Sequence, residues 1–249
     1  MKAEIPRFAV TLAIVIGVLV WAQQGGGMVW EPIYLSLRVA FMAMIYSLVF
    51  GIALAVLLTW RKLPASDFID ALISVPLVLP PTVLGYYLIV SLGPESAAGR
   101  GWQWLTGSPL AFTFNAAVVA AAVGSLPLVV RSVKVGLEAI DPSYQAAART
   151  LGAGPVRVFF TISLPLAMPG VIAGAMMGFA RSLGDYGATM MFASARPHEG
   201  LPTGSIAVMD WLVANRDGDA KQMALVMTVV GIAMLYLANR LNRRMSRRG

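Results

Sequence analysis

Arg181 and Asp185 form an acid–base pair that the sequence places at the end of a long apolar run. They are four residues apart, so on a helix they would share one face and could form an ion pair. One interpretation is a structural ion pair, which neutralises two charges that are costly beside a membrane. The other is a path for an anion, in which Arg181 attracts a dianion and Asp185 prevents it from being trapped. The sequence leaves both interpretations open.

A second set of candidate residues surrounds two adjacent prolines, Pro80 and Pro81, inside another apolar run. Proline interrupts a helix, and a broken helix at membrane depth persists only where protein or a water-filled cavity satisfies the freed carbonyls. We therefore predict a kinked or broken span over residues 71–92 that faces protein or water. The hydroxyls of Thr82 and Thr189, with backbone groups near the prolines, could line a gate. Ordinary helix packing is the alternative for each of these residues.

The chain lacks the residues that several other chemistries need. No glycine-rich loop precedes any lysine, so the sequence has no Walker A motif for binding ATP. No ionisable residue lies near the centre of an apolar run, which argues against a proton or sodium relay. A single histidine, His198, and the absence of cysteine argue against a metal centre and against hydrolysis by a buried serine. We expect no catalytic residue, metal or cofactor in this chain.

Membrane-spanning helices must position these residues. Of the 249 residues, 58% are hydrophobic and 12% are charged, about half the charged fraction of a soluble domain. Six apolar runs approach the roughly 20 residues that cross the hydrocarbon core of a bilayer. They cover residues 8–22, 33–60, 71–92, 110–130, 164–183 and 222–239. The sequence therefore predicts an all-α polytopic membrane protein with six transmembrane helices.

The basic residues orient the predicted bundle. Thirteen lysines and arginines lie on the side of the N-terminus and of the tail 240–249, against four on the other side. Both termini are therefore predicted to be cytoplasmic, and the net charge of +7 reflects this orientation and not nucleic-acid binding. No small-residue cleavage site follows the first run, so residues 1–32 are predicted to form a retained signal-anchor helix and an outer loop.

Two features lie at the outer ends of the predicted spans. Arg38 follows the start of the second run, and its side chain either snorkels to the membrane surface or contacts a substrate. Residues 205–214 are apolar with one aspartate, which predicts a helix packed along the outer face.

Residues 138–165 do not span the membrane and are predicted to be cytoplasmic. Asp141 followed by Pro142 is typical of a helix start, and Gly152 suits a left-handed residue that ends the helix. Residues 156–162 predict a second short helix, which Pro165 should end. Two short helices joined at a glycine form a protrusion suited to docking into another protein, and we call residues 138–165 the coupling loop.

The coupling loop resembles the EAA loop of ABC importer permeases, in which E-A-A, three residues, G, nine residues and I-x-L-P follow in order. Here Gly152 is followed, after nine residues, by Ile162, then by Leu164 and Pro165. The alanine positions hold alanine, but Ala146 stands where the family has glutamate. The first half of the loop comprises Gln145, Ala146, Ala147, Ala148 and Arg149.

Three further stretches are similar to the molybdate branch of that family. They are SLRVA at 36–40, VPLVLPPTVLGYYL at 75–88 and FARSLGDYGATMMF at 179–192. The resemblance implies a type I ABC importer permease fold, with a permease domain over residues 33–239. It also implies a homodimer whose interface holds the path for molybdate, with tungstate as a further substrate.

The resemblance also implies the partners of such a permease. Two cytoplasmic ATPase subunits would bind ATP and magnesium, and a periplasmic binding protein would deliver the anion to a multi-pass protein held in the lipids of a bacterial inner membrane. The alternatives are a permease for another oxyanion such as sulfate, an intramembrane hydrolase or transferase, and a non-transporting scaffold.

Overall fold

The computed structural model describes residues 30–60, 66–193 and 202–246, and within these ranges every regular element is a helix. The first predicted span, residues 8–22, and His198 lie outside the described residues. In chain order the helices are α2 (Trp30–Trp60), α3 (Ser66–Val78), α4 (Pro81–Leu92), α5 (Ala97–Thr106), α6 (Phe114–Glu138), α7 (Pro142–Thr150), α8 (Pro155–Val158), the π-helical turn η2 (Phe159–Ser163), α9 (Leu164–Leu183), α10 (Gly187–Ala193), α11 (Gly204–Val213) and α12 (Asp217–Ser246).

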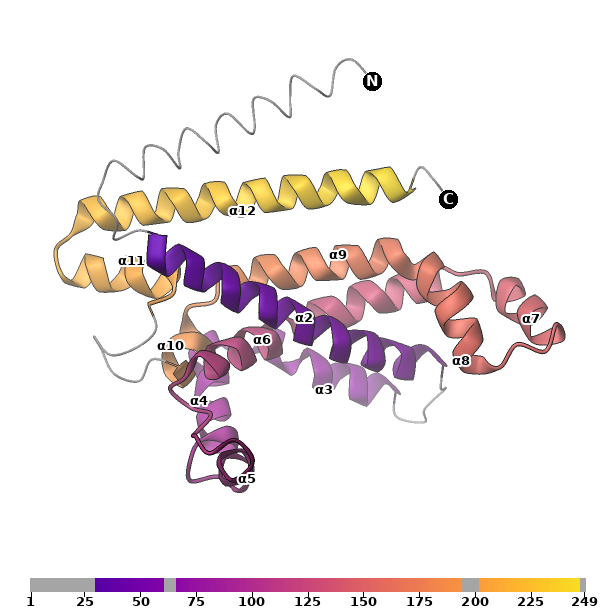
Figure 1. Ribbon diagram of the computed structural model, residues 1–249, viewed down its shortest axis with the longest axis horizontal. Coiled ribbons are helices and arrows are strands. Elements are labelled where there is room, and N and C mark those ends of the chain that lie inside the picture. Colours follow the sequence, from indigo (N-terminus) through magenta and orange to yellow (C-terminus); the bar gives the residue numbers. More distant parts are fainter. Residues whose placement is uncertain (1–29, 61–65, 194–201, 247–249) are drawn as a thin grey trace, which may run out of the picture.

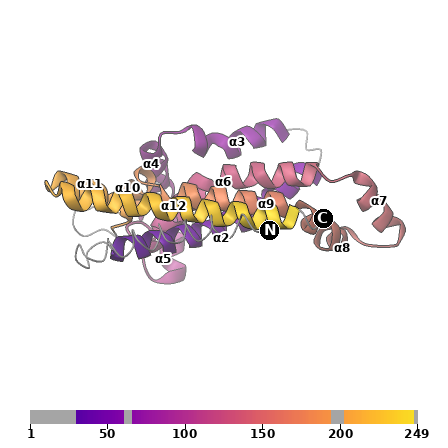
Figure 2. The same ribbon diagram turned by 90° about the horizontal axis from the view of Figure 1, so that it is seen from above.

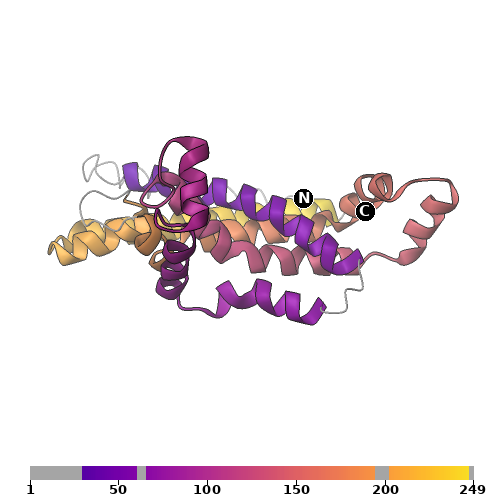
Figure 3. The same ribbon diagram turned by 90° about the horizontal axis from the view of Figure 1, so that it is seen from below.

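Helix α6 is the centre of the bundle. Figure 1 shows α2, α6, α9 and α12 running along the long axis of the molecule. The buried face of α6 carries small residues, among them Ala116, Ala120 and Gly124, which let α2 and α9 approach closely. Helix α3 packs beside α6 and α12 packs beside α9 (Figures 2 and 3).

The described residues contain four helices that are long and apolar enough to cross a membrane. A fifth span results if the bent pair α3–α4 counts as one. The chain is therefore a multi-pass helical membrane protein. The predicted break in the third span is confirmed, because α3 and α4 are bent by 112°. The break falls at Pro80, while Pro76 lies inside α3 without ending it.

Several span boundaries differ from the sequence prediction: α2 begins at Trp30 and not at 33, α3 at Ser66 and not at 71, and α6 at Phe114 and not at 110. Helix α6 continues to Glu138, beyond the predicted end at residue 130, because polar side chains in its last turns find partners on α3. Lys134 Nζ lies 2.6 Å from Asp70 Oδ2, and Arg131 Nη2 donates to Ser74 Oγ over 2.9 Å. Likewise α12 begins before and ends after residues 222–239.

The prediction that Pro165 ends a short helix is wrong. Residues Pro155–Leu183 form one continuous helix that contains a single wide turn, η2. In that turn the Leu164 N–H donates to the Phe159 carbonyl, five residues back. Pro165, which has no N–H to donate, directly follows this wide turn at the start of α9 and does not end the helix.

The helix predicted over residues 205–214 is present as α11 (Gly204–Val213). Its buried residues Ile206 and Ala207 face the bundle, and the Gly204 N–H donates to Ser36 Oγ of α2 over 2.6 Å. This contact ties the α11–α12 hairpin to the end of α2 that lies farthest from α7 (Figure 1).

Candidate functional site

Two helix breaks pack against each other at one end of the bundle. The break before α4 begins at Pro80, and the break between α9 and α10 contains Asp185. Gly187 permits their contact, since a Cβ there would lie 2.8 Å from Pro81 Cβ and 3.0 Å from the Thr82 nitrogen. One turn later, a Cβ at Gly85 would lie 2.6 Å from Met191 Cβ. The sequence segments around Pro81 and around Asp185 therefore meet in space.

Asp185 is the hydrogen-bonding centre of this region. One carboxylate oxygen accepts from Arg181 Nη1 over 3.0 Å. The other accepts from the Thr189 N–H over 2.9 Å and from Thr189 Oγ1 over 2.7 Å. The Asp185 side chain is 2% exposed, so these bonds compensate a charge that burial would otherwise penalise. The Arg181–Asp185 ion pair is therefore present, and the second carboxylate oxygen of Asp185 caps the first turn of α10.

Arg181 reaches from this network toward the bundle interior. Its side chain is 27% exposed, and a Cβ at Gly124 of α6 would lie 3.7 Å from Arg181 Nη2. A guanidinium has five N–H donors, so one bond to Asp185 leaves it able to attract an anion. Of the two predicted hydroxyls, that of Thr189 is buried and donates to Asp185, while Thr82 is exposed beside Pro81.

No group of three or more histidine, cysteine, aspartate or glutamate side chains that could hold a metal ion occurs in the part of the chain that the structure describes.

The coupling loop protrudes from the opposite end of the bundle (Figure 1). As predicted, α7 begins after Asp141, whose side chain accepts from the Ser143 N–H over 2.8 Å. This backbone hydrogen bond, with a side-chain bond from Ser143, holds the pKa of the Asp141 carboxyl below its ordinary value.

The predicted left-handed Gly152 is confirmed, with a φ of 80°. The helix ends in a Schellman motif, in which the Ala153 N–H donates to the Ala148 carbonyl and the Gly152 N–H donates to the Arg149 carbonyl, each over 3.0 Å.

Most residues of the family pattern are accessible on this protrusion. Ala146, Ala147, Arg149, Gly152 and Pro165 are exposed, whereas Gln145, Ala148, Ile162 and Leu164 are half-buried.

The sequence interpretation missed three large apolar residues beside the pattern. Leu151, Val156 and Phe160 are 88%, 68% and 61% exposed. Large apolar residues exposed on a segment outside the spans are candidates for contact with a partner protein. Two of them, Leu151 and Val156, directly adjoin Gly152 and Pro155, where the chain must turn, and this position was the available signal.

Close contact between α6 and α9 supports the coupling loop. A Cβ at Gly170 would lie 2.7 Å from the Ser132 carbonyl oxygen and 2.9 Å from Gly136 Cα, so the two backbones touch. Gly174 and Gly178 continue this seam along α9, where an added Cβ would lie 3.3 Å from Val129 O and 2.9 Å from Val129 Cγ2. Because α6 enters the coupling loop and α9 leaves it, the seam fixes both ends of the loop relative to each other.

Comparisons with known proteins agree with this geometry. The chain is 44% identical over 210 residues, or 84% of its length and 90% of the relative's, to the molybdenum transport system permease protein ModB of Escherichia coli K12. It is 40% identical over 222 residues to the ModB of Haemophilus influenzae, covering 88% of this chain and 95% of that one. Among solved structures, an inward-facing form of the MetNI methionine ABC transporter superposes with a TM-score of 0.68 at 18% identity, covering 91% of this chain and 97% of that one.

The family model described as "Binding-protein-dependent transport system inner membrane component" matches residues 47–248, which is most of the chain. The matched region contains both helix breaks, the glycine seam and the coupling loop. The chain belongs to this family of binding-protein-dependent transport permeases.

Proposed function

We propose that this chain is the transmembrane permease subunit of an ATP-driven molybdate importer. The observation that carries the proposal is the pairing of a rigidly held, accessible coupling loop with two opposed helix breaks at the other end of the same helices. The identity to molybdenum permeases, 44% and 40%, supports molybdate. A sulfate transport permease, CysT of Escherichia coli, is 31% identical over 236 residues, so sulfate is the weaker alternative.

The proposed assembly contains two copies of this chain, each with six spans and cytoplasmic termini, in a bacterial inner membrane. Residues 1–32 supply the first span, residues 33–239 the permease domain and residues 240–249 a basic tail. A periplasmic binding protein delivers the oxyanion, and two cytoplasmic ATPase subunits bind ATP and magnesium. Tungstate, which shares the charge and shape of molybdate, is a further substrate.

The coupling loop docks on an ATPase subunit. Leu151, Val156 and Phe160 supply the apolar contact, and Arg149 supplies a charge at its edge. Ala146 cannot make a carboxylate-mediated contact, so the apolar residues carry more of the binding. Movement of the docked loop passes into α6 and α9 together, because the Gly136–Gly170 contact prevents one helix from sliding without the other.

The anion passes beside the opposed breaks. Pro80, Pro81 and Thr82 lie on the accessible side, and Arg181 gives a weak attraction for a dianion. Asp185, fully hydrogen-bonded, balances the arginine charge so that the anion is not held tightly. Such a path suits a permease that receives its substrate from a binding protein and needs no tight site of its own.

The decisive variant for coupling is Gly152→Glu. A carboxylate on a long side chain at the exposed left-handed residue disturbs both the Schellman turn and the docking surface. We expect normal membrane insertion but uptake of molybdate at least about tenfold lower per ATP hydrolysed. Gly152→Asn, which tolerates left-handed backbone, and Gly218→Glu, at an open position of α12, serve as matched controls. Normal coupling in Gly152→Glu would refute the docking role.

The substrate is tested separately with the reconstituted transporter. Binding protein loaded with molybdate should stimulate ATP hydrolysis, and binding protein loaded with sulfate or phosphate should not. Stimulation by the sulfate-loaded form alone would assign the permease to sulfate.

A further inference from the structure

We propose that the chain binds an anionic phospholipid in a groove between α2 and α6, with Arg38 contacting the lipid phosphate. The acyl chain lies in the groove and the headgroup lies at the end of the bundle opposite the coupling loop. This inference does not depend on the transported substrate. It rests on the depth of Arg38, on its surroundings and on the shape of the surface below it.

The length of α2 places Arg38 at the boundary of the hydrocarbon core. The helix has 31 residues and is therefore about 46 Å long, which exceeds the roughly 30 Å thickness of the core. The stretch from Arg38 to Trp60 alone measures about 33 Å, enough to span the core. The guanidinium therefore lies at the level of the phosphate groups, and the first two turns of α2 project beyond it.

Aromatic rings surround Arg38 and no carboxylate pairs with it among the described residues. Its Cζ lies 5.5 Å from the ring centre of Tyr34 and 5.1 Å from that of Phe114. Rings at this level are typical of the membrane interface. They orient the guanidinium without neutralising it, because a cation–π contact leaves the positive charge in place. A phosphate at the same depth supplies the missing anion and can accept two parallel hydrogen bonds.

An apolar groove begins below Arg38 and runs along the bundle. It has a volume of about 410 Å³ and is lined from α2, α6 and α5. Its lining includes Tyr46, Phe50, Trp102, Asn115, Val119 and Val123.

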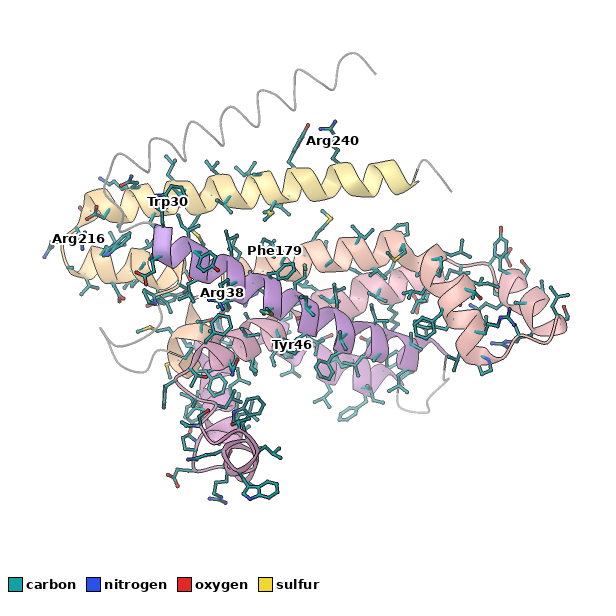
Figure 4. All side chains as sticks on the ribbon, viewed as in Figure 1. Trp30, Arg38, Tyr46, Phe179, Arg216 and Arg240 are labelled. Atoms are coloured by element: carbon teal, nitrogen blue, oxygen red, sulfur yellow. The ribbon has the colours of Figure 1, made fainter. Side chains whose placement is uncertain are left out.

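Tyr46 and Phe50, four residues apart, line the groove from one side of α2, and Arg38 lies about two turns nearer the Trp30 end of the same helix. Figure 4 shows Arg38 nearer the Trp30 end of α2 and Tyr46 farther along the same helix. Phe114, which contacts Arg38, precedes Asn115 at the near end of the groove. The surface thus has one cationic end and one long apolar part.

This arrangement fits a lipid better than the transported oxyanion. A dianion would gain the arginine but would face a lining of aromatic and aliphatic side chains, which cannot replace its water. An acyl chain has no hydration to lose and is compatible with an apolar lining, and its phosphate needs a single cation at the top of the groove.

The test measures lipid retention by the full chain. The protein is reconstituted into nanodiscs of equal parts phosphatidylcholine and phosphatidylglycerol, released into mild detergent and analysed by native mass spectrometry. We expect one retained phosphatidylglycerol per chain and at least about fivefold less retention by Arg38→Gln, the effect of one arginine at a membrane surface. Arg100→Gln, which removes an exposed arginine of α5, is the matched control and should retain the lipid. Val119→Trp, which fills the groove but keeps Arg38, should also lower retention.

Several results would overturn the proposal. They are equal loss in the Arg38 and Arg100 variants, equal retention of phosphatidylcholine, and displacement of the lipid by molybdate. A second copy of this chain could instead cover the groove. Because the chain has no cysteine, Phe50→Cys in the lining of the groove gives a single, exposed thiol. Efficient disulfide formation between two such chains in membranes would show that a protein partner, and not a lipid, occupies the groove.

Discussion

Because the backbones touch at Gly170 and Gly136, replacing Gly170 by alanine should destabilise the protein, which is the opposite of the usual effect in a helix. Replacing an exposed helical glycine by alanine normally stabilises a protein by about 1 kcal/mol, because alanine loses less conformational entropy on folding. At Gly170 the added methyl group would lie 2.7 Å from the Ser132 carbonyl oxygen, roughly 0.7 Å inside the 3.4 Å at which ordinary contact begins. This oxygen and the next nearest atom, Gly136 Cα, belong to the backbone. Because no side chain can rotate away, α6 and α9 must separate.

Overpacking of this kind costs about 1–3 kcal/mol. Set against the gain of about 1 kcal/mol in helix propensity, Gly170→Ala should lower the free energy of unfolding by about 0–2 kcal/mol. Gly231 of α12 is the matched control, since nothing lies within 4 Å of an added Cβ there. Gly231→Ala should stabilise by about 1 kcal/mol, so the two variants should differ by about 1–3 kcal/mol. Gly174→Ala, whose Cβ would lie 3.3 Å from Ser132 Cβ, should fall between them.

The assay is unfolding of the full chain in one fixed detergent, followed by tryptophan fluorescence. The order of stability should be Gly231→Ala, then Gly174→Ala, then Gly170→Ala. If Gly170→Ala is as stable as Gly231→Ala, the backbone contact between α6 and α9 does not exist as described, and the rigid support proposed for the coupling loop fails with it.

Three further predictions follow from the hydrogen bonds. Asp185→Ala leaves buried donors without an acceptor and should cost about 1–3 kcal/mol in denaturation experiments, and its combination with Thr189→Val should cost less than the sum of the two. Ser163→Ala should be neutral or stabilising by up to about 1 kcal/mol, because the buried Ser163 hydroxyl has no partner among the described residues. In contrast, Ser125→Ala breaks the buried hydrogen bond to the Ser47 hydroxyl and should cost about 1 kcal/mol. Asp141→Ala should speed amide exchange in residues 142–150, whereas Asp141→Asn, which keeps a capping oxygen, should not. The pKa of Asp141 is lowered in the folded protein, so the wild-type cap should weaken only as the pH falls below the ordinary pKa of 3.8.

The sequence was sufficient where a single residue type dictates the backbone. The adjacent prolines predicted the break that separates α3 from α4, since few other sequences exclude helix so strongly. Gly152 predicted a left-handed helix end because a residue without Cβ adopts that backbone at no steric cost. The spacing of Arg181 and Asp185 allowed an ion pair, which forms although Asp185 lies just beyond the end of α9.

The sequence was insufficient where the outcome depends on what lies across the bundle. Proline at position 165 is compatible with a helix end or with a helix that continues past a wide turn, and the structure has the second, with η2 directly before α9. The contact of Gly136 with Gly170 joins residues on opposite sides of the coupling loop, and glycine has no side chain whose polarity could predict a partner. The hydrogen bonds from Thr189 to Asp185 form because α10 begins at Gly187, directly after the break that contains Asp185.

Helix α9 connects the coupling loop to the opposed breaks, and its irregular points explain where motion should occur. It leaves the loop through the wide turn η2, where the buried Ser163 hydroxyl lacks a partner among the described residues. At its other end it stops at Gly184, directly before the hydrogen-bonded Asp185. Between these ends the glycine seam holds α9 against α6 by backbone contact, which cannot yield gradually. A force on the coupling loop should therefore leave the middle of α9 unchanged, and the rearrangement should concentrate at η2 and at the break around Asp185.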